Sequence, residues 1–330
     1  MKHSVTYLAL MALLLAVAFI SCQREPLGES EDAIRFSVTQ AVASDLQTKA
    51  APSSESDLNK FKVWGDMKEG TGNWKQVFIN QPQEVTYKQE GSTISWDYGT
   101  TQYWNRNANY RFCAVFPTTA DVQNGSGSDN VIVSYPSLPG YDLMVASSPL
   151  IDAAGNGSEP VKLEFRHACA AVRFLFAKES NDARTYSITG LVLQNISASG
   201  TMTYVGASND SGANISWSTP SKGDYTWTGG PWSVPAATTS VPFAPITARE
   251  WLFAVPQNLT GTPVPTITIS YTVDGRALEV TLDLKTDNIT KWDKGNAYTY
   301  NIKVSPKVIG VTVTTTPWEI VDAATPGLMI

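Results

Sequence analysis

The hydrophobic pattern of the chain consists of short runs in which apolar and polar residues alternate. A period of two is typical of a β-strand that buries one face, whereas an amphipathic helix repeats every 3.6 residues. No run with the helical period is sustained after the first 21 residues, so the sequence predicts an all-β fold. The predicted strands are 34–39, 61–65, 84–88, 110–116, 131–135, 143–146, 161–165, 170–176, 186–193, 201–205, 251–255, 266–273, 277–284, 297–304 and 308–315.

Residues that favour turns separate these runs. Asp274 and Gly275 stand between alternating runs at 267–271 and 278–282. An Asp-Gly pair adopts the backbone of a type I′ turn at low cost, and this turn matches the twist of two paired strands. The sequence therefore predicts a β-hairpin at this point.

The N-terminus departs from the alternating pattern. An apolar run at 7–20 ends at Ser21 and Cys22, and it is shorter than the roughly 20 residues that span a membrane. A small residue directly before a cysteine matches a lipobox, although Phe19 replaces the usual leucine. We expect residues 1–21 to be a signal peptide and Cys22 to carry acyl chains that fix the protein to a membrane, rather than an ordinary secretory signal with a chance cysteine.

Chain length predicts two domains. Without the signal peptide, 309 of the 330 residues remain, which is more than one hydrophobic core usually organises. A polar, glycine-rich stretch at 152–159 interrupts the strands near the middle of the chain. We therefore expect an N-terminal domain at 50–158 and a C-terminal domain at 159–305.

The segment at 44–58 is polar, rich in small residues and without periodicity, which is typical of an exposed loop that proteases cut. Before it, Ile34, Phe36 and Val38 alternate with polar residues and predict a half-buried strand. A cut in the loop would separate this strand covalently from the body of the protein.

Composition restricts the chemistry. The formal net charge of −6 and the lack of a basic block argue against a nucleic-acid partner. If Cys22 is acylated, the mature chain keeps Cys113, Cys169 and one histidine, His167, which excludes histidine-based zinc sites and pairs of catalytic histidines. We expect no metal and no cofactor. The two cysteines lie in apolar strands, so either a disulfide or two buried thiols is consistent with the sequence.

Enzymatic motifs are also missing from the sequence. It has no phosphate-binding loop, nucleophile elbow or calcium loop, so we expect no catalytic residues, although two distant carboxylates can still meet in a fold. We interpret His167 as a structural histidine bonded to the backbone. A loop-rich stretch contains Trp217, Trp227 and Trp232. We favour the interpretation that these side chains cover the end of a sandwich over the alternative that they stack on a sugar.

The C-terminal residues Ile309, Val311 and Val313 alternate with glycine and threonine. They predict one more strand. An edge strand within the same chain and a strand offered to another molecule are equally consistent with this pattern.

Several different motifs follow one another along nearly the whole chain. They are the lipobox, Tyr110-x-Phe112-x-Ala114-Val115-Phe116-Pro117, Asp142-Leu143-Met144, Leu163-x-Phe165-x-His167-Ala168-x-Ala170-x-Val172-x-Phe174 and Trp292-x-x-Gly295-Asn296-x-Tyr298-x-Tyr300-x-Ile302-x-Val304. In these motifs the chain resembles the fimbrillins of Bacteroidetes, the family of major and minor pilins and tip proteins of the type V pilus.

The resemblance implies two tandem transthyretin-like (Greek-key) β-sandwich domains in an outer-membrane lipoprotein at the cell surface. It also implies loss of the propeptide 22–49, by a cut between Lys49 and Ala50. The well-known proteases of the family cut after arginine, so Lys49 is a departure.

Strand exchange is the further implication of the resemblance. The strand of Ile34, Phe36 and Val38 would be displaced, and the appendage 306–330 would donate Ile309, Val311 and Val313 to another copy or a related pilin subunit. This implies a non-enzymatic pilus subunit that adheres to a host or bacterial surface ligand. The alternatives are a surface glycan-binding lipoprotein of a polysaccharide-uptake system and a hydrolase on a sandwich scaffold.

Overall fold

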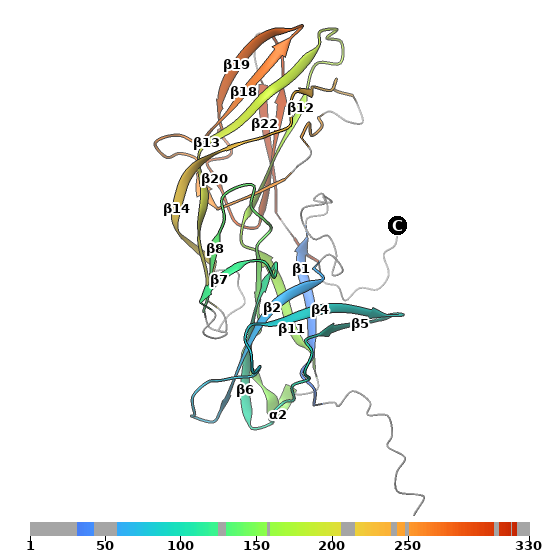
Figure 1. Cartoon of the computed structure of the whole chain (residues 1–330), viewed down its shortest axis with the longest axis vertical. Coiled ribbons are helices and arrows are strands. Elements are labelled where there is room, and N and C mark those ends of the chain that lie inside the picture. The colour runs from blue at the N-terminus through green and yellow to red at the C-terminus, as the bar shows by residue number, and fades with distance from the viewer. Residues whose placement is uncertain are drawn as a thin grey trace, which may run out of the picture.

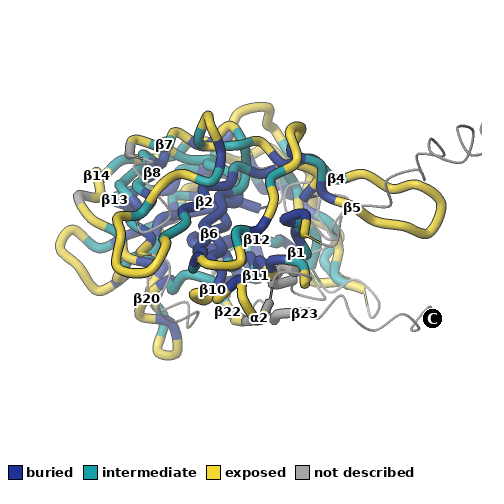
Figure 2. The backbone as a smooth tube through the Cα atoms, turned by 90° about the horizontal axis from the view of Figure 1, so that it is seen from below, coloured by how far each residue is buried: buried dark blue, intermediate teal, exposed yellow. Residues whose placement is uncertain are grey.

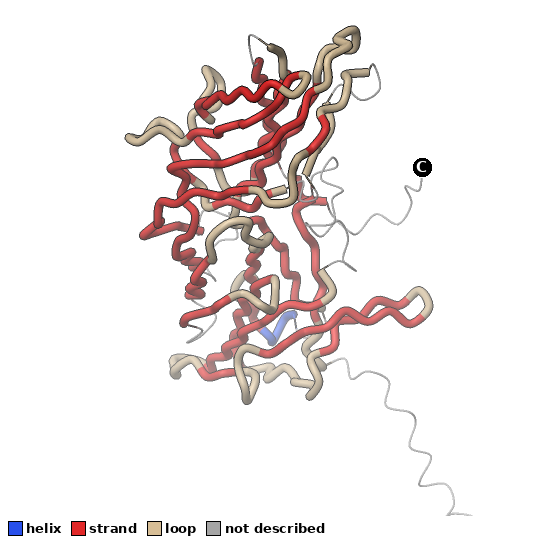
Figure 3. Tube along the Cα trace, turned by 45° about the horizontal axis from the view of Figure 1, so that its top comes forward, coloured by secondary structure: helices blue, strands red, loops and turns tan. Residues whose placement is uncertain are grey.

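The computed structural model describes residues 32–42, 58–124, 130–156, 159–205, 215–238, 243–247, 251–306, 310–317 and 319–321. Strands make up nearly all of the regular structure (Figures 1 and 3). Within the described ranges the only helix is α2 (Ala153–Asn156), a single turn. The predicted all-β fold is confirmed.

A ten-stranded sheet, here called the N-terminal sheet, forms one end of the molecule (Figure 1). The pairs along this sheet are antiparallel except that β1 runs parallel to β11. Its main path is β23 (Glu319–Val321), β1 (Phe36–Val42), β11 (Val161–His167), β9 (Met144–Ser147), β6 (Ala108–Phe116), β2 (Lys60–Glu69), β4 (Gln83–Glu90) and β5 (Thr93–Asp97). The short strands β10 (Ile151–Asp152) and β3 (Lys75–Gln76) pair with β6 and β2.

Two further sheets form the other end of the molecule, here called the C-terminal sandwich, and enclose a core between them. The first is β16 (Leu252–Ala254), β12 (Ala170–Ala177), β21 (Asn296–Lys303) and β22 (Gly310–Pro317). The second is β19 (Arg276–Asp283), β18 (Thr266–Val273), β13 (Tyr186–Val205), β8 (Asn130–Tyr135) and β7 (Asp121–Asn124), with β14 (Ile215–Thr226) and β15 (Trp232–Ser233) also paired to β13. A small pair, β17 (Gln257–Asn258) and β20 (Lys291–Trp292), completes the fold.

Strand β13 joins the two halves of the chain. Its first part pairs with β18, and its last part, from Gly200 onward, pairs with β8. Between these parts Asn195 has a φ of 59°, at a shift in the register with β14. Strands that precede residue 158 pair with strands that follow it at both ends of the molecule. At one end β9 pairs with β11, and toward the other β8 pairs with β13.

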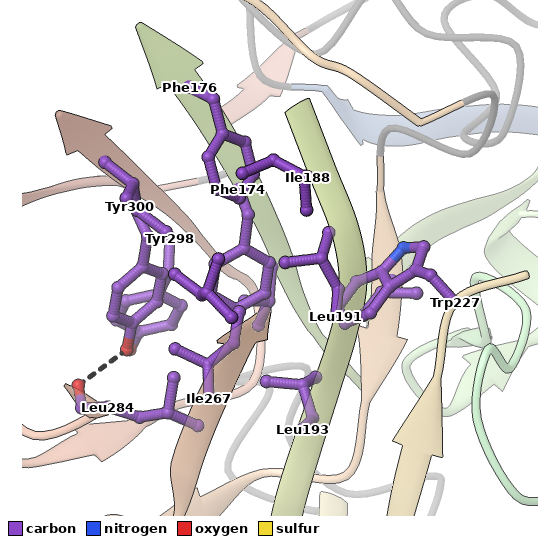
Figure 4. Packing of buried hydrophobic residues seen from close by; sticks show 14 of the residues in the cluster. Phe174, Phe176, Ile188, Leu191, Leu193, Trp227, Ile267, Leu284, Tyr298 and Tyr300 are labelled. Atoms are coloured by element: carbon purple, nitrogen blue, oxygen red, sulfur yellow. Dashed lines mark hydrogen bonds between the residues drawn. The ribbon is translucent and has the colours of Figure 1, made fainter. Parts of the chain in front are cut away.

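Three buried clusters of apolar side chains hold the sheets together, and Figure 2 shows the buried residues gathered in the interior of the molecule. The cluster of the C-terminal sandwich is drawn in Figure 4, where Phe174 of one sheet meets Leu191 and Ile267 of the other. In it the hydroxyl of Tyr300 donates to the carbonyl oxygen of Leu284 at 2.9 Å. The other two clusters lie under the N-terminal sheet and at the junction of the two halves.

The predicted hairpin is confirmed. Strands β18 and β19 pair from Thr266 opposite Asp283 to Val273 opposite Arg276. Asp274 has a φ of 47° and Gly275 a φ of 85°, as a type I′ turn requires.

Candidate functional site

The strand β1 and the surface that it covers form the candidate site. Ile34, Phe36 and Val38 are 1, 6 and 2 % exposed, whereas Arg35 and Ser37 between them are half-buried. The predicted half-buried strand is confirmed.

Backbone hydrogen bonds hold this segment on both sides. On one side β1 lies parallel to β11, and the N–H of Val161 donates to the carbonyl oxygen of Arg35 at 2.7 Å. On the other side the N–H of Ile34 donates to the carbonyl oxygen of Gln102 at 2.8 Å. The N–H of Trp104 donates to the carbonyl oxygen of Asp32, also at 2.8 Å. The segment therefore fills a space between β11 and the chain that follows β5, which we call the first-strand groove.

An aromatic floor lies under the middle of the groove. The ring of Phe36 meets Phe61, Tyr98 and Phe112 at centroid distances of 6.4, 5.6 and 5.6 Å, with interplanar angles of 77–88°. We call these three residues the ring cradle. Edge-to-face pairs each contribute about 0.5–1.5 kcal/mol beyond burial, so the central side chain contributes more to holding β1 than its aliphatic neighbours.

Tyr98 also fixes the backbone of the strand. Its hydroxyl donates to the carbonyl oxygen of Ile34 at 2.6 Å and accepts from the N–H of Gln102 at 3.2 Å. Burial raises the pKa of Tyr98 above its ordinary value, which the hydrogen bond from Gln102 opposes. The hydroxyl thus stays protonated at neutral pH and keeps donating to Ile34, two residues before β1 begins.

The C-terminal strand is paired within its own chain. Strand β22 lies antiparallel to β21 along its whole length, from Lys303 opposite Gly310 to Asn296 opposite Pro317. Its Val311 and Val313 are half-buried against the core of the C-terminal sandwich. Of the two alternatives left open by the sequence, the described residues show the edge strand within the chain.

A short strand links this end of the chain to the groove. Strand β23 follows β22 and pairs antiparallel with the end of β1, from Gln40 opposite Val321 to Val42 opposite Glu319. In the described part of the chain, β1 is its only sheet partner. The N-terminal strand and the C-terminal segment are therefore neighbours in the folded protein.

A family model for fimbrillin-like proteins matches residues 48–318. The chain belongs to the fimbrillin-like family. No curated protein matches the chain.

Solved structures share the β-sandwich fold of this fimbrillin-like protein. A fimbrial protein from Bacteroides vulgatus has 14 % sequence identity and a TM-score of 0.56, with 87 % of this chain and 99 % of that chain covered. A proposed cell adhesion protein from Bacteroides uniformis has 15 % identity and a TM-score of 0.53, with 88 and 100 % covered. At these identities the likeness shows the fold.

Some predicted sites of the fimbrillin-like chain lie outside the described residues. They are Cys22, Lys49, Ala50 and Ile309. The segment that contains the predicted cut begins after Val42, at the end of β1, and the described residues resume at Leu58.

His167 has a partner that the sequence did not reveal. Its Nδ1 donates to Asp142 Oδ1 at 2.7 Å, and the two side chains are 3 and 1 % exposed. His167 ends β11, where the chain leaves the N-terminal sheet, so this buried pair fixes the crossing between the halves. Both residues occur in the motifs that carry the resemblance, but 25 positions separate them and no spacing rule joins them.

The two cysteines and the tryptophans serve packing. Cys113 and Cys169 are buried cysteines, and burial raises the pKa of Cys169 to about 12. Trp227 is buried with its ring edge-to-face on Phe174, and Trp217 Nε1 donates to the carbonyl oxygen of Ala168 at 2.9 Å. These contacts favour the covering role over a sugar-binding platform.

The described ranges contain no group of three metal-ligating side chains. Among the same residues, no helix is long and apolar enough to cross a membrane.

Proposed function

We propose that the protein is a non-enzymatic structural subunit of a cell-surface fimbria, exported as a lipoprotein through Cys22 and assembled by strand exchange. The observation that carries this proposal is the groove occupied by β1. The strand is buried like a core strand, yet the segment that joins it to β2 is the one in which the cut between Lys49 and Ala50 is predicted.

Loss of β1 would leave a surface that needs another strand. The ring cradle would face water, and Val161, Gln102 and Trp104 would lose backbone hydrogen-bond partners. Each unsatisfied group that stays buried costs about 1–3 kcal/mol. An open edge with an apolar floor binds a strand from another chain by β-addition.

The C-terminal appendage 306–330 is the proposed source of that strand, and the sequence predicts Ile309, Val311 and Val313 as its inward residues. Two features support its release. Val311 and Val313 are only half-buried on their own core, and β23 loses its sheet partner when β1 leaves. Donation from each subunit into the next is a contact that does not close, so it grows a filament.

Deletion of residues 308–330 tests the assembly step. We expect the full chain, cut within 43–57 and freed of β1, to form polymers in size-exclusion chromatography and electron microscopy, and the cut deletion variant to stay monomeric. The uncut full chain is the control and should also stay monomeric. Polymers of unchanged length from the deletion variant would refute strand donation by this segment.

Mass spectrometry of the mature N-terminus tests export and processing. An acylated Cys22 in the precursor and a start at Ala50 in the assembled protein are the expected results. Assembled protein that still begins at Cys22 would rule out the proposed cut.

A further inference from the structure

The three inward side chains of residues 34–38, which include the start of β1, are not equivalent. Ile34 and Val38 are aliphatic, whereas Phe36 between them packs against three aromatic rings. A strand that replaces β1 must fill the ring cradle with its own central inward residue. The central one of three alternating residues stays central whichever way the strand runs, so this requirement does not depend on strand direction.

The register predicted from the sequence meets this requirement poorly. With Ile309 and Val313 at the ends, Val311 would occupy the ring cradle in place of Phe36. Valine is much smaller than phenylalanine, and a residual cavity under a buried position weakens packing. Donation of these residues would also unpair β22 from Gly310, at the start of its pairing with β21.

A second register of the same tail supplies an aromatic residue. Trp318 is the only aromatic residue after Tyr300. Thr316 and Ile320 flank it at a spacing of two, so the three share one face of an extended strand. Use of this register would unpair only Thr316 and Pro317 at the end of β22.

The backbone bonds of the groove fit this register when Trp318 takes the place of Phe36. In a donated strand that runs in the direction of β1, Thr316 takes the place of Ile34, whose N–H donates to the carbonyl oxygen of Gln102 and whose carbonyl oxygen accepts from the hydroxyl of Tyr98. A threonine supplies both groups.

Pro317 falls at the position of Arg35. There the N–H of Val161 donates to the carbonyl oxygen of Arg35, and a proline keeps that acceptor. Pro317 thus lies at a position where the donated strand supplies a carbonyl acceptor, and the bond with Val161 needs no N–H from that strand.

We infer that the first-strand groove takes Thr316, Trp318 and Ile320 from a second copy of this chain, with Trp318 in the ring cradle. This inference rests on the strand exchange proposed above. It differs from the register predicted from the sequence, in which Val311 is central.

Strand peptides offered to the cut full chain test the inference. The protein is cut once within 43–57, so that β1 is held without a covalent link, and labelled peptides compete for its place. A peptide of residues 314–323 should bind, Trp318→Ala should weaken it roughly tenfold or more, and Trp318→Phe should not weaken it. Glu319→Gln, at the neighbouring outward position, is the matched control and should bind like the native peptide.

A peptide of residues 307–316 gives the opposite test. It should bind more weakly than 314–323, and Val311→Phe should strengthen it. Equal binding of the native and Trp318→Ala peptides, or tighter binding of native 307–316, would overturn the inference while leaving strand donation intact. Failure of both native peptides, with a peptide of residues 33–42 binding as the reference, would overturn strand donation as well.

Discussion

At the scale of single residues, Phe36 is the side chain on which both the N-terminal sheet and the proposed exchange depend. We expect Phe36→Ala to lower the free energy of unfolding by about 3–5 kcal/mol, because it empties a buried position between three rings. Urea unfolding followed by circular dichroism measures this. Ser37→Ala on the same strand is the control, with an expected change within about 0.5 kcal/mol. A similar small change for Phe36→Ala would contradict the packing described for the groove.

Tyr141 gives a prediction about alkaline pH. Burial, and secondly the nearby Cys169, raise the pKa of Tyr141 from 10.0 to about 12. The folded state therefore favours the protonated phenol. Its contribution to stability is complete below pH 10 and is lost as the pH rises toward 12. We expect Tyr141→Phe to flatten the fall in unfolding free energy over this interval, measured by urea unfolding at fixed ionic strength. An unchanged slope would show that Tyr141 does not contribute to it.

The burial of Ile34, Phe36 and Val38 could be predicted because alternation is a local property of the chain. Their surroundings could not. Phe61 and Phe112 follow Phe36 in other strands, β2 and β6, and only the fold brings them under it. The same reason hides Asp142 from a sequence-based search for the partner of His167.

At the scale of elements, the hairpin of β18 and β19 depends on its turn. Gly275 has a φ of 85° and open space where the methyl group of an alanine would lie, so Gly275→Ala introduces backbone strain without a clash. We expect a loss of about 1–2 kcal/mol in unfolding free energy, measured by thermal or urea unfolding. Gly261 also has open space but lacks a positive φ, so Gly261→Ala is the matched control. It should be neutral or stabilise by roughly 0.4–1 kcal/mol through the unfolded state. Equal effects of the two variants would exclude strain as the cause.

Sequence patterns located most long strands but not how they pair. The runs at 186–193 and 201–205 are parts of one strand, β13, because Asn195 with its φ of 59° permits an irregularity without ending the strand. Strand β14 was not predicted because Pro220 and Gly223 lie inside it. Most of its other residues are polar, so apolar and polar positions do not alternate clearly. The parallel pairing of β1 with β11 rests on contacts between distant segments, which no local pattern encodes.

At the scale of the whole molecule, the junction between the halves is a core rather than a linker. Trp64 and Cys113 of the N-terminal sheet share one buried cluster with Met202, Trp251 and Phe253 from the second half of the chain. The pairing of β8 with β13 crosses the same junction. Such a junction resists bending, which suits the proposed role of the protein as a subunit of a filament.

This junction predicts that the two ends of the molecule unfold together. We expect one transition in calorimetry, and Phe176→Ala, which empties a position confined to the core of the C-terminal sandwich, to speed amide hydrogen exchange in β2 as well as in β18. The reason is that loss of the C-terminal core also uncovers the junction cluster that packs on the N-terminal sheet. Phe253→Ala, at the junction itself, should act on both strands in either case and serves as the control. Faster exchange in β18 alone for Phe176→Ala would mean that the halves are independent domains, and a filament built from them would then bend within each subunit as well as between subunits.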